Sequence, residues 1–479
     1  MAKPVKQTEE REIKLAVPPG FRLPELPGEP LEATRFTSTY VDTEDRRLAR
    51  ARVTLRRRVE RGKSVWQLKL PHDGDRLELE ESGGPSGPPE GLTETIAGLV
   101  RGKELAPVAV LRTKRSGVRV RENGSAIADV VLDEVARMDG RRIAERFTEV
   151  EIEAVDGGDR PALERIAEVL RASGALPSDG RPKVFRSLRV PPRPVPAFTE
   201  EAEHVRAAIE AQYDQMVAHD PGTRVGRDPE ALHRFRVATR RLRAILRAAG
   251  PLLDPGWASE LREELKWLGG VLGPVRDLDV LLEHLEHARA ELLGDERAAS
   301  AELVAKLVAE RADARAAMLE ALASERYVAL LDRLEAAARE PRILAGATTL
   351  ADLAAREFGR LEKAGAGVKA DSSDDALHEL RIRAKRARYA AELAAASIGK
   401  RATRFVECAK LFQDVVGEHQ DAVVAEERIR GLCGTVKDAS VAFAAGRLVE
   451  RQQARRRLSR EAFPPAWQKL QRSGRRAWA

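Results

Sequence analysis

Cysteine, aromatic residues and long apolar runs are scarce in this chain of 479 residues. The two cysteines, Cys408 and Cys433, show no metal-binding or redox spacing, which argues against a zinc knuckle or a disulfide scaffold and fits a reducing cytoplasm. Aromatic residues form 4% of the chain, too few for a protein that stacks single-stranded bases on rings. No apolar run approaches the ~18 residues of a membrane span, and the N-terminus lacks the apolar core of a secretory signal. We expect a cytoplasmic protein without a membrane partner.

An excess of one charge and a phosphate-binding glycine loop are also missing. The net charge is +7, and Lys+Arg exceed Asp+Glu by three over residues 1–200 and by four over the rest. This even balance argues against a nucleic-acid binder with a diffuse basic field. The pattern GxxxxGK[ST] does not occur, which excludes a P-loop enzyme.

A proline-rich segment divides the chain. Residues 191–198 hold four prolines, which favour an extended, stiff linker. Before it, apolar residues alternate with charged ones, and after it Ala, Leu, Arg and Glu recur with helical spacing. We predict a multidomain α+β protein with a β-rich domain at 1–190 and an all-helical domain at 199–479. A helix is expected at 160–173 and an exposed loop at 82–91.

The helical half contains an internal repeat. LHRFRVATRRLRAIL begins at Leu232 and LHELRIRAKRARYAA at Leu377, so His233 and His378 are 145 residues apart. Gly273 and Gly417 keep nearly the same offset, at 144 residues. The repeat predicts two tandem four-helix bundles, at about 199–340 and 341–479.

Charged residues of the N-terminal half share strand faces. Glu10, Glu12 and Lys14 lie on one face, as do Arg56 and Arg58, because side chains alternate along a strand. One interpretation is an open antiparallel sheet with a solvated face. The other, which we favour because acidic and basic clusters occupy separate strands, is an eight-stranded barrel with charged residues inside.

In a closed barrel the inward cations would bind a compact polyanion such as a run of phosphates. Eight basic residues have the required position: Lys14, Arg56, Arg58, Lys69, Arg76, Arg115, Arg119 and Lys183. The inward carboxylates would repel phosphate but suit a hard cation such as Mg²⁺ or Mn²⁺, which prefers oxygen donors. These carboxylates are Glu10, Glu12, Asp133, Glu149, Glu151 and Glu153.

The same residues resemble the CYTH domain of triphosphate tunnel metalloenzymes. The ExExK pattern at residues 10–14 is followed by TLRRR, WQLKLP, VLDE and EVEIE in the expected order, over about residues 5–190. The resemblance implies an eight-stranded antiparallel tunnel, a divalent metal, Mg²⁺ or Mn²⁺, and hydrolysis of inorganic triphosphate, nucleoside triphosphates or thiamine triphosphate. In some members it implies cyclic AMP formation from ATP, as in class IV adenylate cyclases.

The resemblance also implies roles for single residues. It places the metal on carboxylates, with Asp133 preferred to Asp129: Glu10, Glu12, Asp133, Glu149 and Glu151. It places triphosphate on basic residues: Lys14, Arg56, Arg58, Lys69, Arg76, Arg115 and Lys183. Glu10, Glu12 and Lys14 form the catalytic signature, and Glu153 is either a further ligand or the ion-pair partner of a tunnel arginine.

The repeated helix carries a cationic stripe twice. Basic residues follow each histidine at positions +3, +7 and +10, within an arc of about 80° on a helix. The two stripes are His233, Arg236, Arg240 and Arg243, and His378, Arg381, Lys385 and Arg388. Pairing with acids of neighbouring helices is the simpler explanation for one helix. The duplication favours an external polyanion, because like charges at this spacing cost stability.

This half resembles the CHAD domain, over about residues 200–475. The resemblance implies binding of inorganic polyphosphate by the two stripes and Arg276. The second repeat has no arginine at the position of Arg276, which puts a symmetric site in question. Together the two halves predict a metal-dependent triphosphatase, with inorganic triphosphate as preferred substrate and a polyphosphate-binding helical domain. The alternatives are a polyphosphate-binding protein with little catalysis, a class IV adenylate cyclase and a thiamine triphosphatase. The oligomeric state is left open.

Overall fold

A computed structural model describes residues 5–478 apart from 73, 156–157, 180, 189, 191–194, 293, 345, 347 and 434–437. The chain divides into two compact units, Met1–Pro192 with Asp220–Val225, and Arg193–His219 with Gly226–Ala479. Half of the predicted linker, residues 191–194, lies outside the described residues. The exact domain limits stay a prediction.

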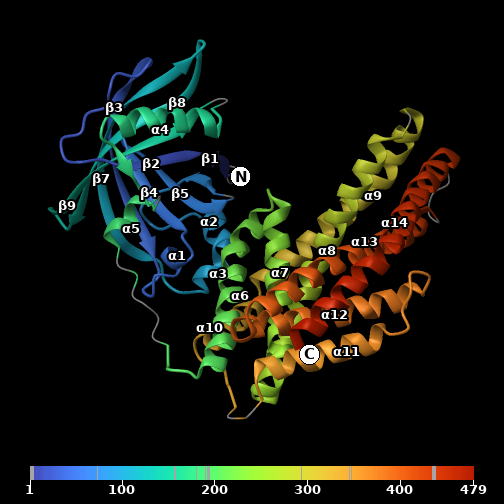
Figure 1. The fold of residues 1–479 in the computed structure, drawn as a ribbon. Helices are drawn as coiled ribbons and strands as arrows, with labels where there is room; N and C mark the ends of the chain where they lie inside the picture. Colours follow the sequence, from blue (N-terminus) through green and yellow to red (C-terminus); the bar gives the residue numbers. More distant parts are fainter. Residues whose placement is uncertain are drawn as a thin grey trace. The chain divides into compact units, whose positions relative to one another are not determined.

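The first unit contains a single antiparallel sheet in the order β1-β6-β5-β4-β3-β7-β8-β9-β2-β10 (Figure 1). Its strands are β1 (Lys6–Glu10), β2 (Glu12–Ala16), β3 (Gly28–Asp42), β4 (Thr54–Glu60), β5 (Lys63–His72), β6 (Asp75–Ser82), β7 (Ala106–Glu122), β8 (Ser125–Asp139), β9 (Arg142–Ala154) and β10 (Leu176–Pro177). The alternation of charged and apolar residues thus predicted strands correctly.

The sheet differs from the prediction in two respects. In the described residues β1 and β10 stand at opposite ends of the strand order and do not pair, so the sheet is open and not the closed barrel that the sequence analysis favoured. The number of strands also differs from the predicted eight. The described residues form ten, because Arg11 interrupts the first strand and because two residues near Leu176 add a short one. The interruption has a structural consequence. β1 pairs with β6 while β2 pairs with β9, so one segment, residues 6–16, pairs with strands from both ends of the order.

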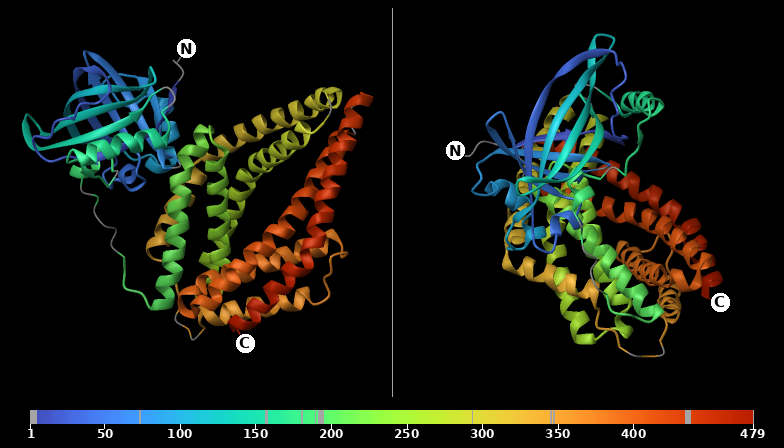
Figure 2. Two further views of the ribbon diagram at one scale, coloured as in Figure 1. Left: turned by 45° about the horizontal axis from the view of Figure 1, so that its top comes forward. Right: turned by 90° about the vertical axis from the view of Figure 1, so that its left-hand side faces the viewer.

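The apolar face of β2, β7, β8 and β9 packs under helix α4 (Arg160–Ala172), which crosses the sheet (Figure 2). Ile13 and Ile152 pack with Leu163 and Leu170 of this helix, which confirms the helix expected at 160–173. The side chain of Asp159 caps its N-terminus by accepting a hydrogen bond from the Ala162 amide at 2.8 Å. Four shorter helices complete the unit: α1 (Arg47–Arg50), α2 (Glu90–Thr95), α3 (Ala97–Val100) and α5 (Lys183–Ser187).

The second unit is helical throughout its described secondary structure, apart from one isolated bridge between Leu253 and Ile343. Its helices are α6 (Glu200–Val225), α7 (Pro229–Ala248), α8 (Pro255–Ala290), α9 (Gly294–Ala323), α10 (Glu325–Arg339), α11 (Leu350–Gly365), α12 (Asp374–Ile398), α13 (Lys400–Cys433) and α14 (Ala439–Trp478), with a short 3-10 turn at Gly250–Leu252. The last six residues of α6 belong to the first unit.

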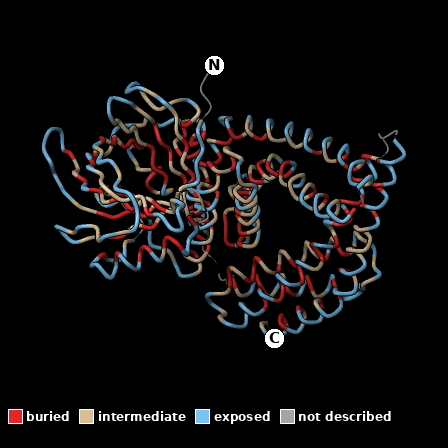
Figure 3. Tube along the Cα trace, turned by 90° about the horizontal axis from the view of Figure 1, so that it is seen from above, coloured by how far each residue is buried: buried red, intermediate tan, exposed pale blue. Residues whose placement is uncertain are grey.

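Three apolar clusters hold these helices together, and their buried residues recur along the inner faces (red in Figure 3). One cluster includes Tyr213, Phe235 and Tyr327, and a second includes Phe405, Phe412 and Trp467. The third joins α8 and α9 to α13 and α14 through residues such as Leu285 and Ile429. The division into two tandem four-helix bundles remains a prediction.

Among the helices of the described chain, none has a stretch apolar enough to cross a lipid bilayer.

Candidate functional sites

The charged face of the sheet lines a pocket of about 250 Å³, which we call the sheet pocket. Ten of the twelve residues that the sequence assigned to metal and triphosphate line it: Glu10, Glu12, Lys14, Arg56, Arg58, Lys69, Arg76, Arg115, Glu151 and Lys183. In total eight cationic and six acidic side chains surround this space. The structure therefore brings the residues together, while their roles remain to be tested.

Two acids of the ExExK segment are held by lysines in the sheet pocket. Lys69 Nζ donates to Glu10 Oε2 at 2.6 Å, and Lys14 Nζ lies 3.1 Å from Glu12 Oε1 and 2.6 Å from Glu151 Oε1. Burial raises the pKa of Glu10, but the charge and hydrogen bond of Lys69 outweigh it and leave that pKa below its ordinary value. Burial likewise lowers the pKa of Lys14, and Glu151 and Glu12 bring it above its usual value.

Lys183 is the centre of the most deeply buried charge cluster. Its Nζ donates to Asp133 Oδ2 at 2.6 Å and to Glu151 Oε2 at 2.7 Å, and lies 3.2 Å from Glu149 Oε1. Arg115 adds contacts to Asp133 and Glu151 at 2.8 and 2.9 Å. Despite burial, the lysine and arginine charges hold the pKa of Asp133 below its ordinary value and that of Glu151 well below it. The pKa of Lys183 is raised well above its usual range by the three acids, against burial.

Lys183, which the sequence analysis counted among the inward cations, reaches the sheet pocket from a helix and not from a strand. It begins α5, and its neighbour Val184 packs against Tyr40, Leu111 and Val135. The apolar side chain of Val184 therefore holds the helix against the sheet, while the adjacent Lys183 reaches the sheet pocket.

The arginines of β4 and β6 line the other side of the pocket. Arg56 donates to Gln67 Oε1 at 2.7 Å and to the Tyr40 hydroxyl at 3.1 Å. The guanidinium of Arg58 lies 3.8 Å from the centre of the Phe36 ring. Arg76 has a buried Nε without a hydrogen-bond partner in the described structure. Burial lowers the pKa of Arg76 and of Arg58, because it disfavours the charged form of a side chain. An anion bound beside these two arginines would compensate the cost.

Some predicted residues lie elsewhere. Arg119, counted among the inward cations, does not line the sheet pocket and pairs with Asp129 at 2.8 Å. Asp133 and Glu149 stand behind the pocket surface and reach it through Lys183. Trp66 is buried on the other face, where its indole donates to the Gly84 carbonyl at 3.0 Å. The sequence analysis gave no role to Glu78, Glu80 or Tyr40, although Glu78 and Glu80 share a strand face with Arg76.

The carboxylates offer the donor type that a hard divalent cation needs, but cations hold them in this structure. Glu78 and Glu149 each have a buried Oε1 without a hydrogen-bond partner, and burial raises the pKa of both. Within the described ranges, no three His, Cys, Asp or Glu side chains converge on one point as metal ligands. The donor chemistry fits Mg²⁺ or Mn²⁺, provided that the lysine partners move aside.

In the second unit, the two cationic stripes follow the same plan. Arg236 Nη2 lies 3.0 Å from Asp277 Oδ1, beside Gly273. A β-carbon added at Gly417 would lie 3.6 Å from Arg381 Nη2, so the equivalent arginine lies equally close to its neighbouring helix.

The repeats differ where the sequence lacks a second arginine. Gln420 occupies the place that corresponds to Arg276, and its Oε1 lies 3.0 Å from His378 Nδ1. In the first repeat, burial and the charge of Arg276 lower the pKa of His233. One histidine therefore faces an arginine, and the other faces a neutral amide.

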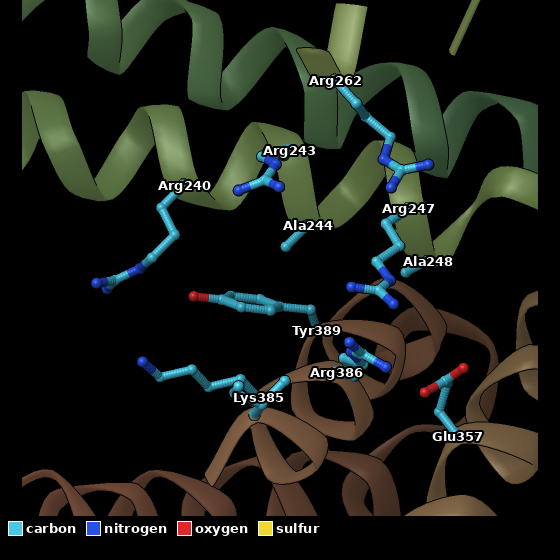
Figure 4. Close-up of a pocket in the computed structure, with 11 residues that line it drawn as sticks. Arg240, Arg243, Ala244, Arg247, Ala248, Arg262, Glu357, Lys385, Arg386 and Tyr389 are labelled. Carbon is cyan, nitrogen blue, oxygen red and sulfur yellow. The ribbon is translucent and has the colours of Figure 1, made fainter. Parts of the chain in front are cut away.

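Helices α7 and α12 enclose a second pocket of about 220 Å³, the helical cavity (Figure 4). Three of the predicted stripe residues line it, Arg240, Arg243 and Lys385. The further lining residues are chiefly Arg247, Arg262, Arg386 and Tyr389. Arg276 and Arg388 are not part of it. Burial, followed by the charges of Arg381, Arg240 and Arg388, lowers the pKa of Lys385 to about 7.

Comparisons with known proteins divide the chain into the same two parts. The CYTH domain model matches residues 8–179 and the CHAD domain model matches residues 207–430. An uncharacterized protein found in two strains of Mycobacterium tuberculosis is 30% identical, over 97% of this chain and 96% of its own length.

Two solved structures are also similar. PptA from Streptomyces chartreusis is 26% identical with a TM-score of 0.48, covering 56% of this chain and 98% of that one. The CHAD domain from the plant Ricinus communis is 27% identical with a TM-score of 0.46, covering 59% of this chain and 96% of that one.

The fold and the matched models define a protein in which a sheet domain with a charged pocket precedes a helical domain. The chain belongs to the family that joins a CYTH domain to a CHAD domain.

Proposed function

We propose that the sheet domain hydrolyses a triphosphate with the help of a divalent metal ion, and that the helical domain binds inorganic polyphosphate. The observation that carries the first part is the sheet pocket itself, where eight cations and six carboxylates surround one space. Cations alone would bind an anion, and carboxylates alone would bind a metal. Their mixture suits a phosphate chain that is bridged by a divalent ion.

Inorganic triphosphate is the substrate we favour over ATP or thiamine triphosphate. The volume of about 250 Å³ is below the ~300–1,000 Å³ typical of pockets for drug-sized organic ligands. Of the described residues that line the pocket, Tyr40 is the one aromatic, and its hydroxyl already accepts a hydrogen bond from Arg56. Trp66, the other aromatic candidate for a base-binding role, faces away.

Glu10, Glu12 and Glu151, supported by Glu78 and Glu149, would hold the metal. A bound Mg²⁺ or Mn²⁺ supplies neutralisation of phosphate charge and acidification of a nearby water. In the structure these acids are bound by Lys69, Lys14 and Lys183. We infer that the lysines exchange partners when substrate arrives, so that each carboxylate turns to the metal and each ammonium to a phosphate oxygen. Arg56, Arg76 and Arg115 would orient the chain by planar, paired hydrogen bonds.

The helical domain would bind polyphosphate through its unpaired cations. In the part of the chain described, Arg240, Arg243, Arg247 and Lys385 have no carboxylate within ion-pair distance. They lie around Tyr389, which is 4% exposed. Arg240, Arg243 and Arg247 are exposed and Lys385 is half-buried. Like charges gathered around one cavity repel one another unless an external anion compensates them. An inorganic polyanion with one charge per phosphate satisfies them.

The decisive experiment is phosphate release from tripolyphosphate, ATP and thiamine triphosphate, each with Mg²⁺, with Mn²⁺ and with EDTA. We expect release from tripolyphosphate that depends on metal and is lost in Glu12→Gln. Glu9→Gln is the matched control, because Glu9 is an exposed acid of the same segment outside the pocket. Full activity of Glu12→Gln would contradict the metal assignment. Cyclic AMP from ATP would instead indicate a cyclase, and no hydrolysis of any substrate would indicate a protein that only binds polyphosphate.

A further inference from the structure

The helical cavity has an unequal distribution of charge that the repeated stripes do not explain. Arg247 lies one further turn along the first stripe, and Arg262 and Arg386 come from α8 and α12. At the 145-residue offset, Arg247 corresponds to Glu392, and at the 144-residue offset Arg262 corresponds to Val406. The first repeat therefore has two cations that the second repeat lacks, and the second repeat has an acid instead.

The acid of the second repeat is engaged locally. Glu392 Oε1 lies 3.4 Å from Arg388 Nε, and that guanidinium also lies over the Tyr389 ring at 4.7 Å. A uniform polyanion that followed a symmetric track would need equal charge in both repeats. The structure instead concentrates cations at one end of the track.

Polar atoms in this cavity lack partners. The Nε atoms of Arg262 and Arg386 and the Tyr389 hydroxyl are buried and make no hydrogen bond among the described residues. All three are donors, so a ligand with several acceptor oxygens is required. Tyr389 is 4% exposed, which shows that the donor is built into the wall of the cavity and is not a surface group.

The donors fall into two groups in Figure 4. The Tyr389 hydroxyl points toward Arg240 and Lys385, whereas Arg247, Arg262 and Arg386 gather on the side of Glu357. Glu357 is the one acid that lines the described cavity, and its charge acts on both Arg247 and Arg386. Glu357 is itself paired with Arg360, whose Nη1 donates to Glu357 Oε1 at 2.5 Å. Its charge therefore offsets the three arginines beside it only in part, and a ligand bound to them must be strongly anionic.

A terminal phosphate differs from an internal one in the way that this arrangement requires. An internal phosphate of the chain has two free oxygens and one negative charge. A terminal phosphate has three acceptor oxygens and about two charges at pH 7, since its second pKa is about 6 in a phosphoryl group. Three arginines in one place match the higher charge and the larger number of acceptors.

We propose that the helical cavity binds the end of a polyphosphate chain, with the terminal phosphate on Arg247, Arg262 and Arg386 and the next one beside Tyr389, Arg240 and Lys385. This inference rests on the proposed polyphosphate binding and adds direction to it. The remaining stripe residues, such as Arg236 and Arg381, would then hold internal phosphates.

The first test is stoichiometry, measured by analytical ultracentrifugation with long-chain polyphosphates of several defined lengths. The experiment uses the full chain with the substitution Arg115→Ala, in the presence of EDTA, so that the sheet pocket does not contribute to polyphosphate binding. End binding predicts two protein molecules per linear chain at saturation, whatever the length. A number that grows in proportion to length would overturn the inference and leave polyphosphate binding intact. No binding of any polyphosphate would instead contradict the proposed function.

The second test compares polyphosphate with the same material whose terminal phosphates are capped as phosphoramidates, which removes charge from the ends alone. We expect capping to weaken binding at least tenfold in the otherwise unchanged protein. The double variant Arg247→Glu with Arg262→Val, which copies the second repeat, should bind both materials equally. Arg236→Ala is the matched control and should weaken both materials by the same factor. Equal affinity for capped and uncapped chains in the unchanged protein would overturn the inference without the need for any variant.

Discussion

Lys183 Nζ and Glu151 Oε2 lie 2.7 Å apart, although the lysine begins a short helix and the glutamate belongs to strand β9. Glu151 is 3% exposed and Lys183 is 7% exposed, so neither charge is solvated. Because Asp133 and Glu149 also face the same ammonium group, removal of the lysine leaves three buried acids with too little positive charge.

Lys183→Met should destabilise the sheet unit by about 3–5 kcal/mol, the usual cost of breaking a buried pair. Hydrogen exchange of peptides from β8 and β9 would measure the loss within that unit. Lys114→Met is the control, because Lys114 pairs with Glu134 at the surface and is 47% exposed; its effect should stay below about 1 kcal/mol. Equal protection of both variants would contradict the central position of Lys183.

The same pair predicts how stability depends on pH. The pKa of Glu151 is lower in the folded protein than in the unfolded chain, so its contribution is present above the unfolded value and is lost as pH falls through the folded one. The pKa of Lys183 is raised, so its contribution is present below the unfolded value and is lost at strongly alkaline pH. We expect the sheet unit to stay stable at neutral pH and to lose protection under acid, and Lys183→Met to have a smaller acid-dependent loss.

Arg115→Ala should lower kcat/KM for triphosphate by at least about 100-fold, the effect of losing one positioned donor. Arg119→Ala should change it less than about threefold, a difference of under ~1 kcal/mol, because Arg119 pairs with Asp129 outside the sheet pocket. The two arginines share a strand and a face, so the comparison separates position from charge. Similar losses in both variants would extend the functional site beyond the pocket.

Polyphosphate binding should take up a proton near pH 8. In the free protein the pKa of Lys385 is about 7, so this amine is largely neutral at pH 8, and a bound anion favours its charged form. Affinity should therefore rise as pH falls from 8.5 toward 7. Calorimetry in two buffers with different ionisation enthalpies measures the proton uptake. Lys385→Arg should bind without it, because arginine stays charged; unchanged uptake in that variant would assign the proton to another group.

Gly474→Ala should lower the stability of the helical unit by about 1–3 kcal/mol. A β-carbon there would lie 2.0 Å from Phe358 Cε2, and that ring is held between Phe405 and Trp478, each with its ring centre 5.6 Å away. Gly446→Ala in the same helix meets nothing within 4 Å and should be neutral or stabilising by up to about 1 kcal/mol. Thermal unfolding followed by tryptophan fluorescence compares them, and a lower melting temperature for Gly446→Ala would refute the packing explanation.

The alternation of residues predicted much of the sheet pocket, because a strand has a period of two and the face of each side chain follows from its number. Glu10, Glu12 and Lys14 were identified in this way, as were Arg56, Arg58 and Lys69. Parity could not tell how far along a strand the pocket extends. Arg119 has the same parity as Arg115 on β7, a strand of 17 residues, and lies beyond the pocket.

The helical cavity was harder to predict, since it depends on which helices meet. The spacing of the stripes gave Arg240, Arg243 and Lys385, and a further step of four residues would have added Arg247. The cavity also takes residues from three different helices, namely Arg262 from α8, Arg386 from α12 and Glu357 from α11. No spacing pattern within a single helix relates these three residues. Tyr389 could not be identified from the sequence, because its distinguishing feature is a buried hydroxyl without a hydrogen-bond partner among the described residues, and this arises only in the folded protein.

The lysine–glutamate pairs of the sheet pocket bear on how each domain responds to ionic strength. Because Lys69 is already neutralised by Glu10, and Lys14 by Glu12 and Glu151, a phosphate chain that enters there replaces one internal contact by another and displaces few dissolved ions. The unpaired arginines of the helical domain must instead attract counter-ions from solution, which a polyanion releases on binding. Potassium chloride should consequently weaken polyphosphate binding by the helical domain steeply while it leaves triphosphate turnover nearly unaffected. The two domains of one chain would then bind their phosphate ligands with very different sensitivity to salt.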